Sequence, residues 1–481
     1  MVLLDAGPDY SLASDLPDDL RNGHDNSYVD HDWKLRYEPS GERSDRFPRG
    51  RVTGGSTAVN TTIALRGIPA DFDHWASLGN PEWAWPNVLE AHNRSERDLD
   101  FGTEPYHGDA GPISVRRWTP DELTPPQAAF IEAAVAAGFP RCDDVNAPDA
   151  VGVGPMAMNK LGRLRISTAI GYLASARFRD NLTICPDTTV ARVLIERTAS
   201  GVRATGVETA GGERIQARLV VLSAGAILTP GLLVRSGIGR REELDRLGID
   251  AVAVVDGVGA NLADHPALAV LLVPKFPEFC GPELPLVQTI CRYTGRGSDI
   301  DLDVNIELMT RATGRNGEVL FMLAPSLEWV EGRGEVRQTS ADPDALPQIA
   351  SNFGQDPKDL ARHVTALEDA LALTRQAPLT EFIEAVRFPD LGRSTREDLT
   401  GLARQRSASG YHPCGTARMG PASDPSAVVD QYGRCHAVDQ LVVADASIMP
   451  TVPRANINLS TIMIGEMVGE WIRTNGARYG L

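Results

Sequence analysis

The sequence has few cysteines and no closely paired ones. Its six cysteines are scattered through 481 residues without a C-x-x-C spacing, which is too sparse for a disulfide framework in a chain of this length. The nine histidines form no H-E-x-x-H motif and none sits at cluster spacing with cysteine, so we predict no metal site. The cysteine usage favours a reducing compartment, and we expect a cytoplasmic protein.

Basic residues and long apolar runs are also in short supply. Lys and Arg number 47 against 64 Asp and Glu, which gives a net charge of −17 and argues against nucleic acid or anionic lipid as a partner. The longest apolar runs, such as residues 267–274, fall far short of the ~18 residues that a membrane-spanning helix needs. No secretory signal opens the chain, because Asp5 follows the first four residues at once. We therefore expect neither a membrane span nor a nucleic-acid partner.

The chain starts with a short apolar run, residues 2–4, that predicts a buried strand ending at Asp5. In a nucleotide-binding α/β fold, a strand that ends in a carboxylate is the second one, and its carboxylate binds the ribose hydroxyls. A surface carboxylate is the alternative reading of Asp5. The glycine-rich phosphate loop should lie ~20 residues earlier, where this sequence has no room for it. Residues 152–157 match G-x-G-x-x-A, but they follow a polar loop and include Pro155, so we interpret them as a connecting loop.

A glycine pair near residue 54 stands before an apolar, helix-compatible run. Gly54 and Gly55 lack side chains that would keep a ligand away from the main chain, and Ser56 and Asn60 can add hydrogen bonds to that ligand. A plain loop-to-helix junction is the alternative. The pattern therefore indicates a possible ligand-binding turn.

A second glycine-punctuated stretch, residues 219–239, predicts a buried strand, a tight turn and a helix that stops at Gly237. A hydrolase nucleophile at Ser223 would need the pattern G-x-S-x-G. Val221 occupies the first glycine position, so a structural serine is the better interpretation.

The C-terminal part carries one histidine in a turn-rich loop and a strand that ends in Asp. His412 has a side chain whose ordinary pKa suits proton transfer near neutral pH, although an isolated histidine is more often structural. Residues 441–447 predict a strand that ends at Asp445, and residues 462–472 predict an apolar helix. The acidic pair at 143–144 is interpreted as solvated loop charge.

Taken together and in this order, these motifs resemble the glucose–methanol–choline (GMC) family of flavin oxidoreductases. Residues 50–67 resemble the first signature of the family, and residues 225–239 resemble the second. The other matching stretches occupy their expected relative places: 106–108 with 111–112, 257–265, 340–343, 412–416 and 445–447. The resemblance extends over essentially the whole chain.

The resemblance implies an α/β fold in two parts. A Rossmann-like FAD-binding domain, with its first strand and phosphate loop absent, would comprise residues 1–70, 150–265 and 405–481. An α+β substrate-binding domain with an antiparallel sheet would comprise residues 71–149 and 266–404. Five runs rich in β-branched and apolar residues are expected in that sheet: 268–273, 286–293, 301–309, 319–329 and 335–339.

The chemistry implied by the resemblance is oxidation of a small-molecule alcohol to an aldehyde or ketone, in the manner of a choline dehydrogenase-like alcohol oxidase or dehydrogenase. His412 matches the histidine that accepts the hydroxyl proton while the carbinol hydride moves to flavin N5. Asn458 falls at the second catalytic position, where it would hydrogen-bond the alcohol oxygen. The helix that begins near Thr461 would offset negative charge on the flavin through its N-terminus.

The resemblance also implies how FAD is held. Asp5 would bind the adenosine ribose, and Val190 would contact adenine through its main chain. The flavin, ribityl and pyrophosphate contacts carried over from the family are Gly54, Gly55, Ser56, Asn60, Thr61, Asp445, Ala446 and Asn456. The position at which some relatives attach flavin through histidine is Val59 here, so we expect non-covalent FAD.

The departure from the family is the missing first strand, glycine loop and first helix. Either the chain starts at an internal methionine or it is a variant with weak cofactor binding, because each lost N–H contact to pyrophosphate removes ~1.5–3 kcal/mol. Two other functions stay open: a lyase on the same scaffold, and a cofactor-free binding protein. The alcohol, and dioxygen or a quinone as electron acceptor, are not specified by the sequence.

Overall fold

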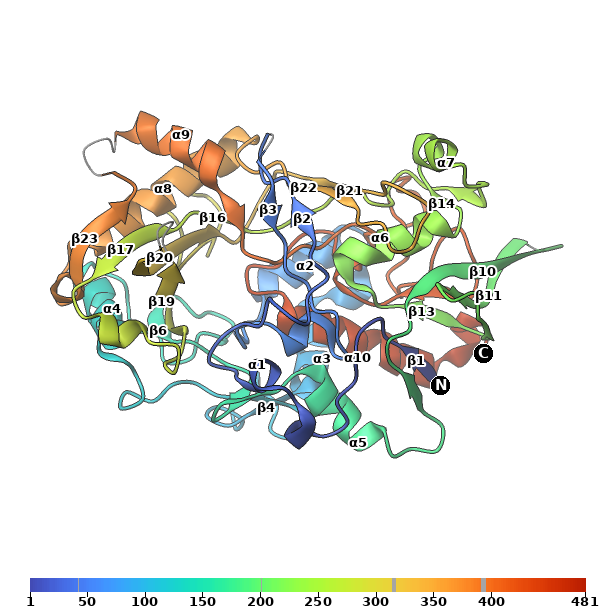
Figure 1. Ribbon diagram of the computed structural model, residues 1–481, viewed down its shortest axis with the longest axis horizontal. Helices are drawn as coiled ribbons and strands as arrows, with labels where there is room; N and C mark the ends of the chain where they lie inside the picture. Colours follow the sequence, from blue (N-terminus) through green and yellow to red (C-terminus); the bar gives the residue numbers. More distant parts are fainter. Residues whose placement is uncertain (42, 200, 314–316, 391–394) are drawn as a thin grey trace.

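Most of the longer strands lie toward the two ends of the molecule, and several helices and short strands lie between these ends (Figure 1). The computed structural model describes the chain except residues 42, 200, 314–316 and 391–394. The helices are α1 (Asp18–Arg21), α2 (Pro69–Ser77), α3 (Trp85–Ser95), α4 (Pro125–Ala136), α5 (Ala174–Ala176), α6 (Gly225–Arg235), α7 (Arg241–Leu247), α8 (Pro357–Leu373), α9 (Arg396–Arg406) and α10 (Asn458–Thr474). None of the helices in these described ranges combines the length and the hydropathy needed to cross a membrane.

A large antiparallel sheet occupies one end, in the order β23–β17–β20–β19–β18–β6. Its strands are β6 (Gly152–Pro155), β17 (Val270–Pro274), β18 (Val287–Tyr293), β19 (Val304–Thr313), β20 (Val319–Leu327) and β23 (Ile383–Phe388), with β16 (Pro266–Ala267) and β24 (Ala408–Ser409) joined at the side. Helix α8 contacts β17, β19 and β20. The side chains of Val304, Ile306 and Leu308 lie fully buried in the main hydrophobic core. Because side chains alternate along a strand, the intervening residues of β19 face the opposite way.

Two expectations about this sheet are wrong. Residues 152–155 form the edge strand β6 rather than a connecting loop. Gly152 and Gly154 are needed there because a Cβ would meet the main-chain oxygens of Pro140 and Cys142 at 2.0 and 1.7 Å, so the glycines allow close backbone packing and bind no phosphate. The run 335–339 lies outside the sheet, because β21 (Glu335–Arg337) pairs with β22 (Gln348–Ala350). The other four expected runs do lie in the sheet.

The other end contains two parallel strand pairs. Strand β1 (Val2–Leu4) pairs with β9 (Thr183–Cys185), and β13 (Val220–Leu222) pairs with β25 (Leu441–Val443). Strand β1 therefore has β9 as its partner. Figure 1 shows the two termini close together at this end, beside the meander β10 (Val190–Thr198), β11 (Gly201–Thr209) and β12 (Arg214–Gln216).

Short strands complete the fold: β2 (Arg36–Tyr37), β3 (Asp45–Arg46), β4 (Glu96–Asp98), β5 (Ile113–Val115), β7 (Lys160–Leu161), β8 (Leu164–Arg165), β14 (Ile238–Gly239) and β15 (Ala253–Val254). A second apolar cluster joins the two ends, since it brings Val287 and Ile290 of β18 together with Ala455 and Leu459 near the start of α10. Strands β6 and β24, from segments predicted for the FAD-binding domain, belong to the large sheet.

Candidate active site

The loop that carries His412 is fixed by the preceding Asp264–His265 pair. The main-chain N–H of His412 donates to Asp264 Oδ1 at 2.9 Å, and the hydroxyl of Ser409 donates to the other carboxylate oxygen. The N–H of Gly410 donates to the carbonyl oxygen of His265 at 2.7 Å. Asp264 is 3% exposed, so these bonds form in a buried place. They determine the position of the His412 ring.

The His412 ring lies between a second histidine and an amide. Its Nδ1 is 3.0 Å from Nδ1 of His265, and its Nε2 is 3.0 Å from Nδ2 of Asn456. An amide N–H can donate only to an unprotonated ring nitrogen, so in this arrangement Nε2 is the free base. Burial, and then the charges of His265 and Arg49, hold the pKa of His412 well below its usual value. The imidazole is therefore neutral at neutral pH and able to accept a proton.

Behind His265 lies a buried carboxylate. Glu328 Oε2 is 3.3 Å from Nδ1 of His265, and its Oε1 accepts a hydrogen bond from Ser326 at 2.6 Å. His265 is 0% and Glu328 2% exposed. The three groups form a row, Glu328–His265–His412, along which positive charge on His412 is stabilised.

The two C-terminal asparagines are placed differently from the expectation. Asn456, which the family resemblance assigns to the cofactor, is the one that contacts His412. Asn458 is the first residue of α10, and its Nδ2 is buried without a hydrogen-bond partner among the described residues. An unpaired buried amide N–H costs free energy, so this group is available to a ligand oxygen.

At the other end, Asp5 and Val190 lie close together. Oδ1 of Asp5 accepts the N–H of Gly7 at 2.8 Å, and its carbonyl oxygen accepts the N–H of Thr188 at 2.7 Å, two residues before Val190 starts β10. Burial, together with repulsion from Asp9 and Asp187, raises the pKa of Asp5. A hydroxyl-bearing ligand that donates hydrogen bonds suits this carboxylate.

The glycine pair at 54–55 lies next to the segment that follows β1. The N–H of Thr53 donates to the carbonyl oxygen of Pro8 at 2.9 Å, which joins the two segments. Gly54 and Gly55 have φ values of +98° and +55°, the left-handed region that favours glycine. A Cβ on Gly55 would meet nothing within 4 Å, so this side of the turn is open.

The neighbouring side chains organise that turn. Ser56 Oγ accepts the N–H of Gly50 at 3.2 Å, and Asn60 Oδ1 accepts the N–H of Thr62 at 3.0 Å. Thr61 directly follows Asn60 in the sequence and is half-buried. Ser56 and Asn60 thus shape the main chain through these bonds.

The Asp445 carboxylate points into the protein. Oδ2 accepts bonds from the Gly225 N–H at 2.9 Å and from the Thr229 hydroxyl at 2.6 Å, and Oδ1 accepts the Ser447 N–H at 2.8 Å. Burial raises the pKa of Asp445. Its side chain therefore stabilises the N-terminus of α6, and together with the buried Ala446 it can contact a ligand only through the main chain.

A separate buried cluster contains three potential metal ligands, Glu96, Asp98 and His107, the one such group found in the described ranges. Guanidinium groups already pair with its carboxylates: Arg66 with Glu96, and Arg117 with Asp98. Such pairing neutralises the charge that would attract a metal ion.

Asp144 belongs to this cluster, since it accepts from His107 at 2.9 Å and from Arg117 at 2.6 Å. Burial opposes ionisation, but these two partners outweigh it and lower the pKa of Asp144 to about 2. The expectation of a solvated charge is therefore wrong for Asp144, because the chain folds back over it.

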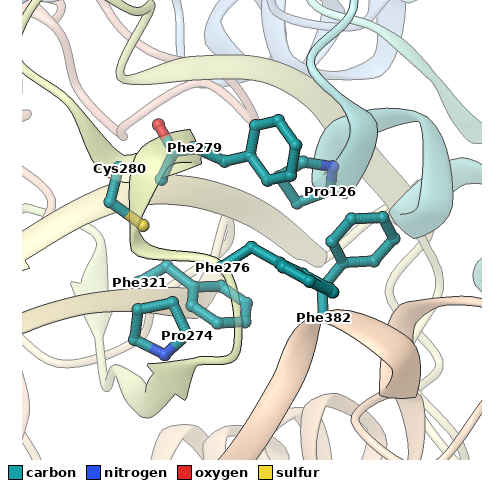
Figure 2. Close-up of a pocket in the computed structure, with 8 residues that line it drawn as sticks. Pro126, Pro274, Phe276, Phe279, Cys280, Phe321 and Phe382 are labelled. Atoms are coloured by element: carbon teal, nitrogen blue, oxygen red, sulfur yellow. The ribbon is translucent and has the colours of Figure 1, made fainter.

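Two hollows are lined by no residue of the candidate site. Figure 2 shows the first, of about 10 Å³, where Phe276, Phe279 and Phe382 meet beside the large sheet. It has room for no more than a water molecule. The second, of about 410 Å³, is lined by polar and small residues of the meander and by Gln440.

His265 and Glu328 carry little signal in the sequence. Asp264 and His265 are part of a stretch that matches the family, but nothing local marks their contact with His412, which lies 147 residues further along. Glu328 directly follows strand β20, and nothing in its local sequence distinguishes it from other acidic residues that follow strands. Only the pairing of β16 with both β20 and β24 brings these three residues together.

Comparison with known proteins agrees with this arrangement. Two family domains, both described as GMC oxidoreductase, match residues 39–267 and 330–465. The chain is 35% identical to a 5-(hydroxymethyl)furfural oxidase of Methylovorus sp. (strain MP688), over 89% of this chain and 83% of the relative. It is 33% identical to an oxygen-dependent choline dehydrogenase of Cronobacter sakazakii, over 98% and 90%. The crystal structure of pyridoxine 4-oxidase from Mesorbium loti superposes with a TM-score of 0.89 at 27% identity, over 98% of this chain and 94% of that one.

The fold and the matched domains define a two-part flavin oxidoreductase. The chain belongs to the GMC oxidoreductase family. This confirms the expected family. It also confirms the expected fold class, which is a Rossmann-like FAD-binding domain with a substrate domain built on an antiparallel sheet, and the expected activity of an FAD-dependent enzyme that acts on alcohols.

The residues present fit the two ends of FAD. The carboxylate of Asp5 suits a ribose, and the open side of Gly55 suits polar atoms of a flavin. In the described residues no glycine-rich turn follows a strand that pairs with β1, and the N-terminus of α6 is taken by Asp445. Pyrophosphate contacts are thus the weakest part of the fit.

Proposed function

We propose that His412 is the catalytic base for alcohol oxidation and that Asn456 and Asn458 position the alcohol oxygen. The observation that carries this proposal is the His412 ring itself, neutral and with Nε2 directed at an amide. When bound, FAD accepts the hydride from the carbinol carbon. The protein contributes a base for the hydroxyl proton and amide donors for the oxygen as it gains negative charge.

The row behind His412 supports the same role. After Nε2 takes the hydroxyl proton, the Nδ1 proton can shift along the 3.0 Å bridge to His265, which places the positive charge next to Glu328. A buried carboxylate stabilises such a charge. Asp264 contributes by fixing the loop rather than by moving a proton.

For the cofactor we propose that Asp5 binds the ribose, Val190 the adenine, and Gly54 and Gly55 the flavin side. Ser56, Asn60 and Thr61 support that side, and Asp445 and Ala446 face the ribityl end through main-chain atoms. Asn456, which the resemblance assigns to that end, is given to the alcohol instead because its amide contacts His412. Val59 is aliphatic and offers no atom for a covalent link, which supports non-covalent FAD. The proposed FAD-binding part keeps the predicted segments, with β6 and β24 assigned to the substrate part.

The experiment is anaerobic mixing of the FAD-loaded protein with primary alcohols while the visible flavin absorbance is recorded. We expect the absorbance to bleach in the wild type and to persist in H412A. Asn456→Ala should slow bleaching by about 10²-fold, the cost of one lost donor to a developing oxyanion.

The matched control is His436→Ala, because His436 is a histidine of the same C-terminal region whose Nε2 lies 3.0 Å from the carbonyl oxygen of Gly420, and its ring bonds no residue of the candidate site in the part of the chain that the structure describes. Bleaching that continues in H412A contradicts the assignment of the base. Cleavage of an alcohol without bleaching would instead identify a lyase, and a protein that takes up no FAD would identify a binding protein.

We propose dioxygen or a quinone as the electron acceptor and the cytoplasm as the location. Reoxidation of the reduced flavin in air-saturated buffer, compared with its reoxidation by a quinone under nitrogen, separates an oxidase from a dehydrogenase.

All six cysteines are free thiols, which supports the proposed cytoplasmic location.

A further inference from the structure

A buried lysine outside the candidate active site has no acceptor for its N–H groups. Lys160 is the first residue of β7 and is 1% exposed. Its Nζ has no hydrogen-bond partner among the described residues and lies 3.6 Å from the ring centroid of Trp118. The face of an indole ring attracts the positive charge, but an ammonium group carries three N–H donors. Burial of this charge without acceptors is costly, so Lys160 is a group that a ligand can complete.

Trp118 presents a second unpaired donor next to the first. It is 7% exposed, and its Nε1 is buried with no hydrogen-bond partner in the part of the chain that the structure describes. An indole N–H can only donate. Two side chains in contact, from two separate segments, thus offer N–H donors that no described residue accepts. Buried donors without acceptors cost free energy, and this pair indicates a binding site for a group with acceptor oxygens.

The charges around Lys160 are mostly positive. Arg116, Arg163 and Arg165 repel its ammonium group, and Glu122 attracts it. The Glu122 carboxylate accepts two hydrogen bonds from the guanidinium group of Arg116, so its negative charge is already paired. Burial, followed by repulsion from Arg116, lowers the pKa of Lys160 to about 7. The site therefore favours a negatively charged ligand, in a chain whose net charge is −17.

His24 lies at the solvent side of this pair. Its ring is partly exposed and makes a T-shaped contact with the Trp118 ring, at a centroid distance of 5.8 Å. Burial, followed by the charge of Lys160, lowers the pKa of His24 to about 4, so this ring is neutral at neutral pH and does not compete for an anion. Its Nδ1 lies 3.5 Å from the carbonyl oxygen of Glu283, which makes a weak hydrogen bond at best. A ligand can therefore reach the two donors by displacing this ring.

We propose that Lys160 and Trp118 form a binding site for a small carboxylate, with one carboxylate oxygen at Lys160 Nζ and the other at Trp118 Nε1. A carboxylate brings two acceptor oxygens and one negative charge, which match the two donors and the one unpaired ammonium charge. A neutral amide or alcohol leaves that charge without a partner. The site contains none of the residues proposed for the base or the cofactor, so this inference goes beyond the proposed function.

Carboxylate binding at this site is coupled to protonation of Lys160. The bound anion stabilises the ammonium form, so binding raises the pKa of Lys160 above its value of about 7 in the free site, and a proton is taken up at pH 8. The affinity should fall by about 5-fold between pH 7 and pH 8, as the free site loses this proton. The other groups that face Lys160 keep their charge in this range, because the arginines stay protonated and the pKa values of Glu122 and His24 are about 2 and about 4.

The test is isothermal titration of the FAD-loaded protein with sodium acetate at constant ionic strength, with acetamide as the neutral isostere. We expect the wild type to bind acetate about 10-fold or more tightly than acetamide. Titration at pH 8 in two buffers of different ionisation enthalpy should reveal the proton uptake. K160M should bind acetate about 10-fold or more weakly, with no proton uptake. W118F keeps an aromatic face but lacks the N–H, and should bind acetate about 3- to 10-fold more weakly.

The matched control is Lys275→Met, because Lys275 also lies beside an aromatic ring, that of Phe276, but is exposed. It should leave acetate binding unchanged. K160M removes a buried charge that has no counter-charge, so it should unfold at a temperature no lower than that of the wild type. The proposal is overturned if the wild type does not bind acetate, if acetamide binds as tightly, or if K160M binds acetate as the wild type does.

A kinetic experiment separates two sources of the carboxylate. Acetate is added while a primary alcohol bleaches the flavin under nitrogen. An acetate-dependent rise in the half-saturating alcohol concentration identifies the acid group of a substrate or product, because the two ligands then compete. An unchanged value identifies a separate carboxylic acid that binds at this site. The titration with acetate needs no alcohol, so its result does not depend on His412 being the base.

Discussion

Replacing Glu328 with Gln removes one negative charge behind His412 while nearly preserving the shape of the side chain. The bond from Ser326 to Oε1 at 2.6 Å can persist with an amide oxygen. What is lost is the carboxylate 3.3 Å from His265, toward which the proton on the histidine bridge moves after His412 has taken the substrate proton. The variant therefore tests the negative charge of Glu328 rather than the packing of its side chain.

The size of the effect follows from the distance. Two opposite charges ~4 Å apart interact by ~4 kcal/mol at an effective dielectric constant of ~20. This interaction energy is reduced by the charge of Arg292 beside Glu328 and by the sharing of the positive charge between the two imidazole rings. We expect a loss of about 1–3 kcal/mol in the stability of the protonated histidine pair, which corresponds to a roughly 10- to 100-fold slower bleaching of the flavin.

The assay is stopped-flow bleaching under nitrogen across a range of pH. E328Q should bleach slowly at every pH, and the apparent pKa of the base should move further down, because the imidazolium has lost a stabilising charge. Ser326→Ala is the control, since it removes a hydrogen bond and keeps the charge. Equal rates for E328Q and the wild type, or equal losses in E328Q and S326A, refute the reasoning.

Three further predictions concern stability and cofactor binding. Asp144→Asn removes the carboxylate that pairs with Arg117 and His107 in a buried place, although Asp98 still pairs with both. It should lower the free energy of unfolding by about 1.5–3 kcal/mol in urea titrations, whereas Asp143→Asn should change little. Burial lowers the pKa of His363 from 6.5 to about 4. As pH falls, the unfolded chain binds a proton on this histidine before the folded chain does, so about 3 kcal/mol of the free energy of unfolding is lost between these two pH values. His363→Gln should flatten the dependence of stability on pH in this range. Gly50→Ala brings a Cβ to 2.3 Å from the carbonyl oxygen of Gly55 and should weaken FAD binding in fluorescence titrations, while Gly465→Ala, with open space around it, should not.

The strands of the large sheet and the position of His412 are predictable from sequence because their signals are local. Runs of β-branched residues mark β17 to β20, and a histidine in a turn-rich loop suits proton transfer. Strand β6 was missed because Pro155 and two glycines argue against a strand. Its edge position makes them acceptable, and the carbonyl groups of residues 140 and 142 make the glycines necessary.

The roles of the two asparagines show where local signals end. Asn456 and Asn458 are two residues apart in a loop-to-helix junction, and sequence spacing does not reveal which amide reaches the imidazole. The loop entering α10 directs Asn456 to His412 and leaves Asn458 at the first turn of the helix.

By itself the sequence determined the family and the two-part fold, and it pointed to His412 as the proposed base, because these depend on motifs and on the periodicity of apolar residues within short segments. The tertiary structure alone decided which groups surround that base. His265, Glu328 and Asn456 come from three distant segments, and their contacts depend on strand pairing and burial, which no short stretch of residues contains. The same holds for the charge that His412 and Asp144 carry, since burial and neighbours separated by many residues set their pKa values.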